Sequence, residues 1–328
     1  MNRNAAAVDV EPSLVGGTSA PDAPGRVVIE LRGLTKRFGA RQALAGIDLS
    51  LTTAQIVGIV GPDGAGKTTL IRAIAGRVRL DGGTVSLYGR TLEPEKPRPD
   101  LGVVPQENAL YPLLTARENL ETFGRLNGID GKHLNERIAW ALEWTGLADR
   151  ARSPVRTFSG GMKRRLNLAC GVLHEPKLVL LDEPTVGVDP QSRESIYDML
   201  AALRARGTSL LLTTHYLEEA EARCERIVVV DHGRAVAAGT LAELVEQAGL
   251  AGRRVRLSLD RAVSSPVSGF TRDADDRVLT ATITDVGHEL PGLLARVQGA
   301  GLGVRDLEVR TASLQAVFLA LTGKELRE

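Results

Sequence analysis

The sequence predicts an α/β fold with a mostly parallel sheet, because strand-like and helix-like segments alternate along most of the chain. Continuous apolar runs, typical of strands buried on both faces, occupy residues 177–181, 209–214 and 226–230. A segment with helical spacing separates the first two runs. A strand, a helix and a second strand in this order form a right-handed parallel unit covered by helices.

The first strand of this sheet is expected at residues 55–60, a short apolar segment followed by a glycine-rich turn. A helix from Lys67 to Ala75 follows the turn, and Gly76 suits its C-terminal stop. The helix after residue 181 is also well marked. Asp189 can cap it, Pro190 suits its first turn and Gly207 ends it. Its apolar residues recur with helical spacing and form one inner stripe: Ile196, Met199, Leu200 and Leu203.

A second, smaller domain is expected at the C-terminal end. Thr240 and Glu243 form a capping box that opens a helix ending near Gln247, and glycines 249 and 252 then indicate a joint. The pattern beyond it predicts strands at 255–259, 278–284 and 304–309, a helix over 289–297 and a last helix from Ser313. We therefore divide the chain into a tail over residues 1–25, a main domain over 26–248 and an α+β accessory domain over 249–328.

Composition excludes several function classes. Among 328 residues, 41 Lys plus Arg balance 40 Asp plus Glu, and only five Phe, four Tyr and two Trp are present, so no nucleic acid partner is expected. The two cysteines, Cys170 and Cys224, form no metal-binding spacing and suit a reducing compartment. The longest uncharged run, residues 49–62, is too short and too polar to span a membrane. We expect a cytosolic chain.

A phosphate cradle is predicted where the first strand meets its helix. Glycines let the backbone curl around phosphates, so that N–H groups and the helix N-terminus face the negative charge. Lys67 can reach the β- and γ-phosphates, and the Thr68 hydroxyl suits a Mg²⁺ ligand. The alternative is an ordinary glycine-rich turn with a surface lysine. The residues of the expected nucleotide site are Gly61, Pro62, Asp63, Gly64, Ala65, Gly66, Lys67, Thr68 and Thr69.

Two carboxylates follow the apolar strand at 177–181, at the sheet edge where α/β folds bind ligands. Asp182 could hold Mg²⁺ through water, and Glu183 is placed to polarise an attacking water as general base. The alternative is that both simply cap the next turn.

The segment from Phe158 to Arg165, which reads Phe-Ser-Gly-Gly-Met-Lys-Arg-Arg, resembles the signature sequence of ATP-binding-cassette (ABC) ATPases. Other elements of this family occur in the same order: Gln106 of the Q-loop, Gly187–Pro190 of the D-loop, His215 of the switch, and Phe38 at the aromatic position beside adenine. The resemblance covers residues 27–245. It implies a P-loop ABC ATPase domain in which an antiparallel β part and a helical subdomain, about residues 105–175, accompany the parallel core sheet.

The resemblance also assigns roles. Ser159, Gly160 and Gly161 would point at the γ-phosphate bound by the opposite subunit, so that a homodimer sandwiches two ATP molecules. Gln106 would bind Mg²⁺ and the water, or be an ordinary loop glutamine. His215 would contact the γ-phosphate and orient Glu183, or be a surface residue. Phe38 would stack on adenine, or belong to the core. The basic run 163–165 is expected to form a solvated helix face.

Phe158 replaces the usual Leu of the signature, and Met162 and Lys163 replace the usual Gln and its neighbour. Both departures resemble the branch of exporters for drugs, polyketides and lipid-linked or chitin-like oligosaccharides. The expected function is the ATP-hydrolysing subunit of an exporter, peripheral on the inner face of the cell membrane through a separate membrane-spanning permease. Residues 107–120 are the expected docking surface. The alternatives are a soluble ABC-type ATPase in DNA repair or translation, and a regulatory nucleotide-binding module.

Overall fold

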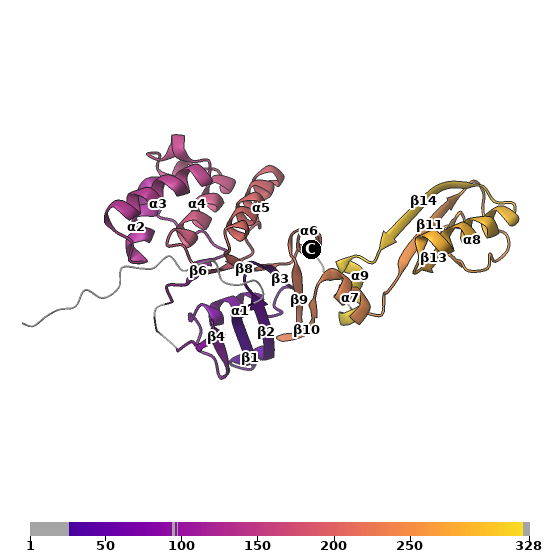
Figure 1. Cartoon of the computed structure of the whole chain (residues 1–328), viewed down its shortest axis with the longest axis horizontal. Coiled ribbons are helices and arrows are strands. Elements are labelled where there is room, and N and C mark those ends of the chain that lie inside the picture. Colours follow the sequence, from indigo (N-terminus) through magenta and orange to yellow (C-terminus); the bar gives the residue numbers. More distant parts are fainter. Residues whose placement is uncertain (1–25, 94–95, 97, 324–328) are drawn as a thin grey trace, which may run out of the picture.

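The computed structural model describes residues 26–93, 96 and 98–323, and its centre is a six-stranded sheet (Figure 1). The predicted tail over 1–25 lies outside the described residues. The strand order is β10-β9-β3-β8-β7-β6, with β6 to β9 and β3 all parallel and β10 antiparallel at the edge. The strands span Ile56–Val60 (β3), Leu101–Val104 (β6), Leu178–Asp182 (β7), Ser209–Thr214 (β8), Arg226–Asp231 (β9) and Arg234–Gly239 (β10).

Both faces of this sheet are covered, as its continuous apolar strands require: β3, β7 and β8 are buried throughout. On one face, α1 (Lys67–Ile74) shares a core with a second, antiparallel sheet of order β2-β1-β4-β5. Its strands are β1 (Val27–Phe38), β2 (Arg41–Thr52), β4 (Gly82–Leu87) and β5 (Arg90–Thr91). The opposite face packs on α5 (Pro190–Ala205). Asp189 caps α5 by accepting the Ser192 N–H at 3.0 Å, which confirms its predicted start.

A helical subdomain lies beside β6 and β7, at the upper left of Figure 1. It contains α2 (Ala116–Leu126), α3 (Gly131–Trp144), two 3-10 turns (Ala148–Arg150 and Val155–Thr157) and α4 (Gly160–Val172) around its own apolar core. Ser159 caps α4, accepting the Met162 N–H at 3.2 Å. Because α4 also packs on the central sheet, it joins the helical subdomain to the strand ends.

The C-terminal part forms a small α+β unit that projects away from the sheets, in orange and yellow in Figure 1. Its antiparallel sheet has the order β12-β13-β11-β14, and α8 (Val286–Gly299) covers one face over a separate apolar core. The strands are β11 (Arg253–Leu259), β12 (Thr271–Arg272), β13 (Val278–Ile283) and β14 (Val304–Thr311). The helix begins three residues before its predicted start, because Asp285 caps it by accepting the His288 N–H at 3.1 Å.

The last helix, α9 (Leu314–Thr322), does not pack in this α+β unit, where the sequence analysis placed it. Leu314, Val317 and Phe318 are instead buried in the main domain, among residues of β3, β9, α6 (Leu217–Arg223) and α7 (Leu241–Gln247). The Glu221 carboxylate of α6 accepts the Leu314 N–H at 2.8 Å. Helical spacing shows that a helix has an apolar face, but not which neighbour covers that face.

Candidate active site

The turn between β3 and α1 has the shape of a phosphate cradle. Gly64 and Gly66 have positive φ values of 82° and 110°. A Cβ at Gly66 would lie 2.4 Å from the Ala43 carbonyl oxygen, and one at Gly61 would lie 2.1 Å from that of Val230. Glycine is therefore required at both positions. Gly66 is also the N-cap of α1 and provides no side-chain cap, so the first N–H groups of α1 open into the turn.

Lys67 lies inside this turn and is only 5% exposed. Its Nζ donates to the Gly61 carbonyl at 2.7 Å and to the Pro62 carbonyl at 3.2 Å. It also forms ion pairs with Asp63 at 3.7 Å and Glu183 at 3.8 Å. The cation is thus held among the cradle's own carbonyls, where it can meet a phosphate that enters the turn.

The end of β7 brings a carboxylate beside the cradle. Asp182 Oδ1 accepts from Thr213 Oγ1 at 2.8 Å and from Thr68 Oγ1 at 3.2 Å. Asp182 is buried, and these two threonines come from β8 and α1. A carboxylate and a hydroxyl side by side are hard oxygen ligands of the type that Mg²⁺ prefers, so Thr68 and Asp182 fit this ion.

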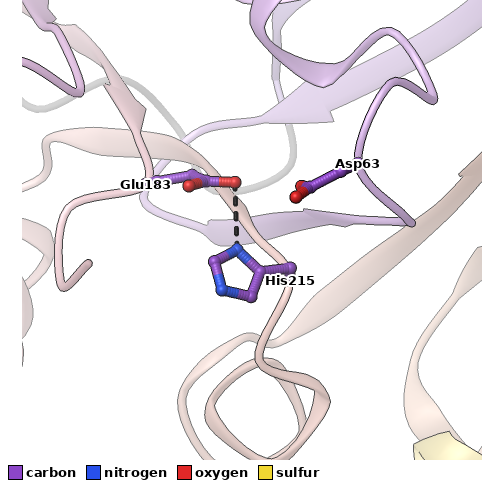
Figure 2. Close-up of side chains that lie close together, drawn as sticks. All are labelled: Asp63, Glu183 and His215. Atoms are coloured by element: carbon purple, nitrogen blue, oxygen red, sulfur yellow. Dashed lines mark hydrogen bonds and ion pairs between the residues drawn. The ribbon is translucent and has the colours of Figure 1, made fainter. Parts of the chain in front are cut away.

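Glu183 is the centre of a second group, to which three separate parts of the chain contribute. Its Oε1 lies 3.1 Å from His215 Nδ1, and Gln106 Nε2 donates to its Oε2 at 3.0 Å. Figure 2 shows His215 and Asp63 on two sides of the Glu183 carboxylate. Glu183 has a φ of 46°, a left-handed conformation that costs a non-glycine residue roughly 1–2 kcal/mol. The fold therefore holds this carboxylate in place against a local preference.

One cleft of about 740 Å³ contains most of the predicted nucleotide-site residues. Phe38 is 50% exposed at this cleft, so it does not belong to the core. The cleft is lined by Phe38, Arg41, Ala43, Asp63, Gly64, Gly66, Lys67, Thr68, Thr69, Gln106, Glu183, Val186 and His215. It joins an exposed aromatic ring, the cradle and the carboxylate group in one open site.

Seven of the predicted site residues do not line this cleft. Four of them, Gly61, Pro62, Ala65 and Asp182, belong to the turn and the strand end that border it, whereas the three signature residues lie elsewhere. Ser159, Gly160 and Gly161 form the N-terminus of α4, and Ser159 and Gly160 are exposed there. Gly161 is buried, and a Cβ at its position would lie 2.1 Å from Ser192 Oγ. Within one chain, the signature segment and the phosphate cradle are thus separate surfaces.

Two arginines, one in the cleft and one behind it, were not predicted from the sequence. Arg41 lies between Phe38 and the cradle and donates to the Gly64 carbonyl at 3.0 Å. Arg164 is buried, so the prediction of a solvated face for the basic run 163–165 is wrong there. Helical spacing was the available signal for Arg164, because the buried residues Gly161 and Leu168 lie three and four positions away on the same face of α4.

The fold and the cleft define a P-loop ATPase. A family model described as "ABC transporter" matches residues 44–186. The daunorubicin resistance ATP-binding protein DrrA3 of Streptomyces coeruleorubidus is 40% identical over 91% of this chain and 97% of its own length. The linearmycin resistance ATP-binding protein LnrL of Bacillus subtilis is 36% identical, over 92% and 100%. The Nod factor export ATP-binding protein I of Ralstonia nicotianae is 38% identical, over 94% and 98%.

A solved structure of an ATP-binding subunit of an ABC transporter superposes with a TM-score of 0.63 at 31% identity, over 68% of this chain and 94% of that one. This chain belongs to the ATP-binding subunits of ABC transporters, and it is an ATPase of the exporter type. Membership in this group does not favour the alternative role in DNA repair or translation. Among the described residues, no helix is long and apolar enough to cross a membrane.

Proposed function

We propose that two copies of this chain close around two ATP–Mg²⁺ and thereby drive export through a separate membrane-spanning permease. The observation that carries this proposal is the separation of the two phosphate-binding surfaces. The cradle and Glu183 lie in the cleft, whereas the exposed N-terminus of α4, at Ser159 and Gly160, is outside it. A helix N-terminus favours an anion, so the α4 end of one copy can complete the cleft of another.

In this proposal, catalysis depends on positioning and electrostatics. Lys67 and the N–H groups of the cradle hold the β- and γ-phosphates, and Phe38 stacks on the adenine. Thr68, Asp182 and Gln106 would hold Mg²⁺, which supplies positive charge to the phosphate oxygens when bound. Glu183 accepts a proton from the attacking water, and His215 fixes the direction of its carboxylate.

The docking surface for the permease is proposed at residues 107–120, which follow Gln106. Tyr111 and Leu113 are 48% and 79% exposed there. Asn119 is fully buried beneath them, where its Oδ1 accepts the Tyr111 N–H at 2.8 Å and its Nδ2 donates to the Thr115 carbonyl at 2.9 Å. Two exposed apolar side chains on a firmly held loop suit contact with another protein.

We infer that the cargo is a drug, lipid or oligosaccharide, and the relatives named for daunorubicin resistance, linearmycin resistance and Nod factor export support export of such a molecule. The chain would then work on the inner face of the cell membrane, held there by its permease.

The test is the Glu183→Gln variant, examined by size-exclusion chromatography with ATP and Mg²⁺. Glutamine keeps the shape of Glu183 but cannot accept the proton, so we expect an ATP-bound dimer that persists without turnover. The matched control, Glu183→Gln combined with Lys67→Ala, should remain monomeric because the cradle then holds the phosphates poorly. A monomer of Glu183→Gln under saturating ATP–Mg²⁺, or full turnover by this variant, would refute the proposed mechanism.

A further inference from the structure

Arg164 of α4 contacts backbone carbonyls from two separate loops. Its Nη1 donates to the carbonyls of Pro105 at 2.8 Å and Gln106 at 2.7 Å. Its Nη2 donates to the carbonyls of Asp182 at 3.0 Å and Glu183 at 2.8 Å, and its Nε donates to that of Pro184 at 2.6 Å. Five donor hydrogens thus meet five acceptors, at the ends of β6 and β7.

This guanidinium is 4% exposed and has no hydrogen bond or ion pair with a carboxylate among the described contacts. The carboxylates beside it point elsewhere: Asp182 to Thr213 and Thr68, and Glu183 to His215 and Gln106. Burial lowers the pKa of Arg164 to about 10. A buried cation is costly, and here five carbonyl acceptors offset that cost.

Arg164 fixes the backbones of Gln106 and Glu183 relative to each other. The Gln106 and Glu183 carbonyls bind the two terminal nitrogens of one planar group. The side chains of the same two residues meet at 3.0 Å in the cleft. Because a guanidinium is rigid and forked, it sets the separation of the two backbones in a way that a flexible ammonium cannot. It also holds the Glu183 carbonyl, whose residue has the left-handed φ of 46°.

The helix that carries Arg164, α4, also contacts the proposed docking surface and presents its N-terminus at the protein surface. One turn along α4, Asn167 Oδ1 accepts the Ala109 N–H at 3.1 Å, at the start of the proposed docking surface. At its N-terminus, α4 presents Ser159 and Gly160. One helix, α4, thus contacts both the proposed docking loop and the Glu183 backbone.

We propose that Arg164 is a positioning residue, which sets the Gln106–Glu183 pair for water attack. This inference rests on the proposed role of Glu183 and assigns the contact that controls it. Arg164 itself touches neither nucleotide nor water in this scheme. Its effect is expected on turnover and not on nucleotide affinity.

The test uses the full chain with Arg164→Lys, which retains a cation, and Arg164→Met, which retains only the length. Arg125→Met is the matched control, because Arg125 is an exposed arginine of α2, paired with Glu121 and outside the cleft and the signature segment. We expect kcat to fall by about 10²-fold for Arg164→Met and less for Arg164→Lys, while the Kd of a fluorescent ATP analogue changes by less than about threefold. Arg125→Met should leave both values unchanged. Should Arg164→Met fail to fold, Arg164→Lys alone decides the outcome.

A double-mutant cycle with Gln106→Ala distinguishes positioning from a general structural role. If Arg164 acts through the Gln106–Glu183 pair, Arg164→Lys lowers kcat of the Gln106→Ala variant much less than it lowers that of the wild type. Additive losses, an equal loss of ATP affinity, or unchanged kcat in a folded variant would overturn the inference. The Glu183→Gln variant distinguishes failure of the proposed function from failure of this inference. If Glu183→Gln is inactive and Arg164→Lys is fully active, only the role of Arg164 is refuted.

Discussion

His215 Nδ1 lies 3.1 Å from Glu183 Oε1, although the two residues come from different strand ends and are far apart in the sequence. Glu183 directly follows β7 and His215 directly follows β8, and these neighbouring strands are parallel, with Asp182 paired to Thr213. The Thr213 hydroxyl also accepts the Glu183 N–H at 3.0 Å. The register of β7 and β8 therefore brings the two side chains together. The distance between them is set by the pairing of two strands and not by the conformation of a loop.

The His215→Ala variant should show whether this contact matters for turnover. Without the imidazole, Gln106 and Lys67 are the polar partners left to the Glu183 carboxylate among the described residues, so this carboxylate is less well directed. We expect kcat for ATP hydrolysis, measured from the phosphate produced, to fall by about 10²-fold, with little change in the Kd for the nucleotide. His232→Ala is the control, since His232 is exposed and outside the cleft. Normal turnover by His215→Ala would contradict the assigned role.

The composite site can be tested by mixing two inactive variants, Lys67→Ala and Gly160→Asp. A Cβ at Gly160 would have 3.9 Å to its nearest neighbour, so aspartate fits. A carboxylate also suits a helix N-terminus, but it repels a phosphate bound there. Alone, each variant should form no working site. A mixed dimer contains one site with an intact Lys67 and an intact Gly160, so ATPase activity should return on mixing.

The fraction of activity recovered should rise to about a quarter of wild type when equal amounts combine at random, since about half of the dimers are mixed and each has one intact site. Thermal unfolding of Gly160→Asp should match that of the wild type. Were each chain to form its site alone, mixing would restore nothing.

The sequence was sufficient for β3, β7, β8, β9, β11, β13 and β14 and for the glycine-rich turn after β3, because these features depend on local patterns. It did not place the strands β1, β2, β4, β5, β6, β10 and β12. Glycines at Gly61 and Gly66 and the apolar runs are read directly from neighbouring residues. Arg164 was misjudged because a charged residue is normally exposed, and only the three-dimensional convergence of two loops supplies its five carbonyls. The docking of α9 was missed for a related reason, since packing between distant segments leaves no local signature.

The packing of α9 predicts that alanine substitutions at Phe318 and Leu319 have very different effects on the free energy of unfolding. Phe318 is 2% exposed in the core of the main domain, whereas Leu319 is 42% exposed. Phe318→Ala should lower the free energy of unfolding by about 3–5 kcal/mol, because it removes apolar contacts and leaves a cavity. Leu319→Ala should change it by less than about 1 kcal/mol. Urea denaturation monitored by circular dichroism measures both values, and equal effects would contradict the described packing.

The two thiols should be unreactive in the folded chain. Cys170 is buried, and burial raises its pKa far above the ordinary value of 9.0. Burial likewise raises the pKa of Cys224 to about 12. Because the thiolate is the reactive form, Ellman's reagent at pH 8 should modify native protein very slowly and modify both thiols after denaturation in guanidinium. Rapid labelling of the native chain would contradict this burial.

The raised pKa values of the two thiols predict that the folded chain loses stability at alkaline pH. The folded chain holds these protons more firmly than the unfolded chain does. Their contribution to the free energy of unfolding is therefore complete below pH 9 and is lost as the pH rises toward about 12. A Cys224→Ala variant should show a shallower loss of stability over this interval in urea titrations, and an unchanged slope would contradict the raised pKa of the Cys224 thiol.

The return of α9 to the main domain has a practical consequence. The chain leaves the main domain after α7 and re-enters it at α9, and residues 249–250 and 312–313 line one shared pocket at this crossing. The α+β unit is thus connected to the main domain at both of its ends, and the two connections lie next to each other. A short glycine-serine bridge from Ala248 to Ser313 could therefore replace it and yield a trimmed enzyme that keeps its terminal helix. Grafting of the unit between relatives should follow the same two cut points.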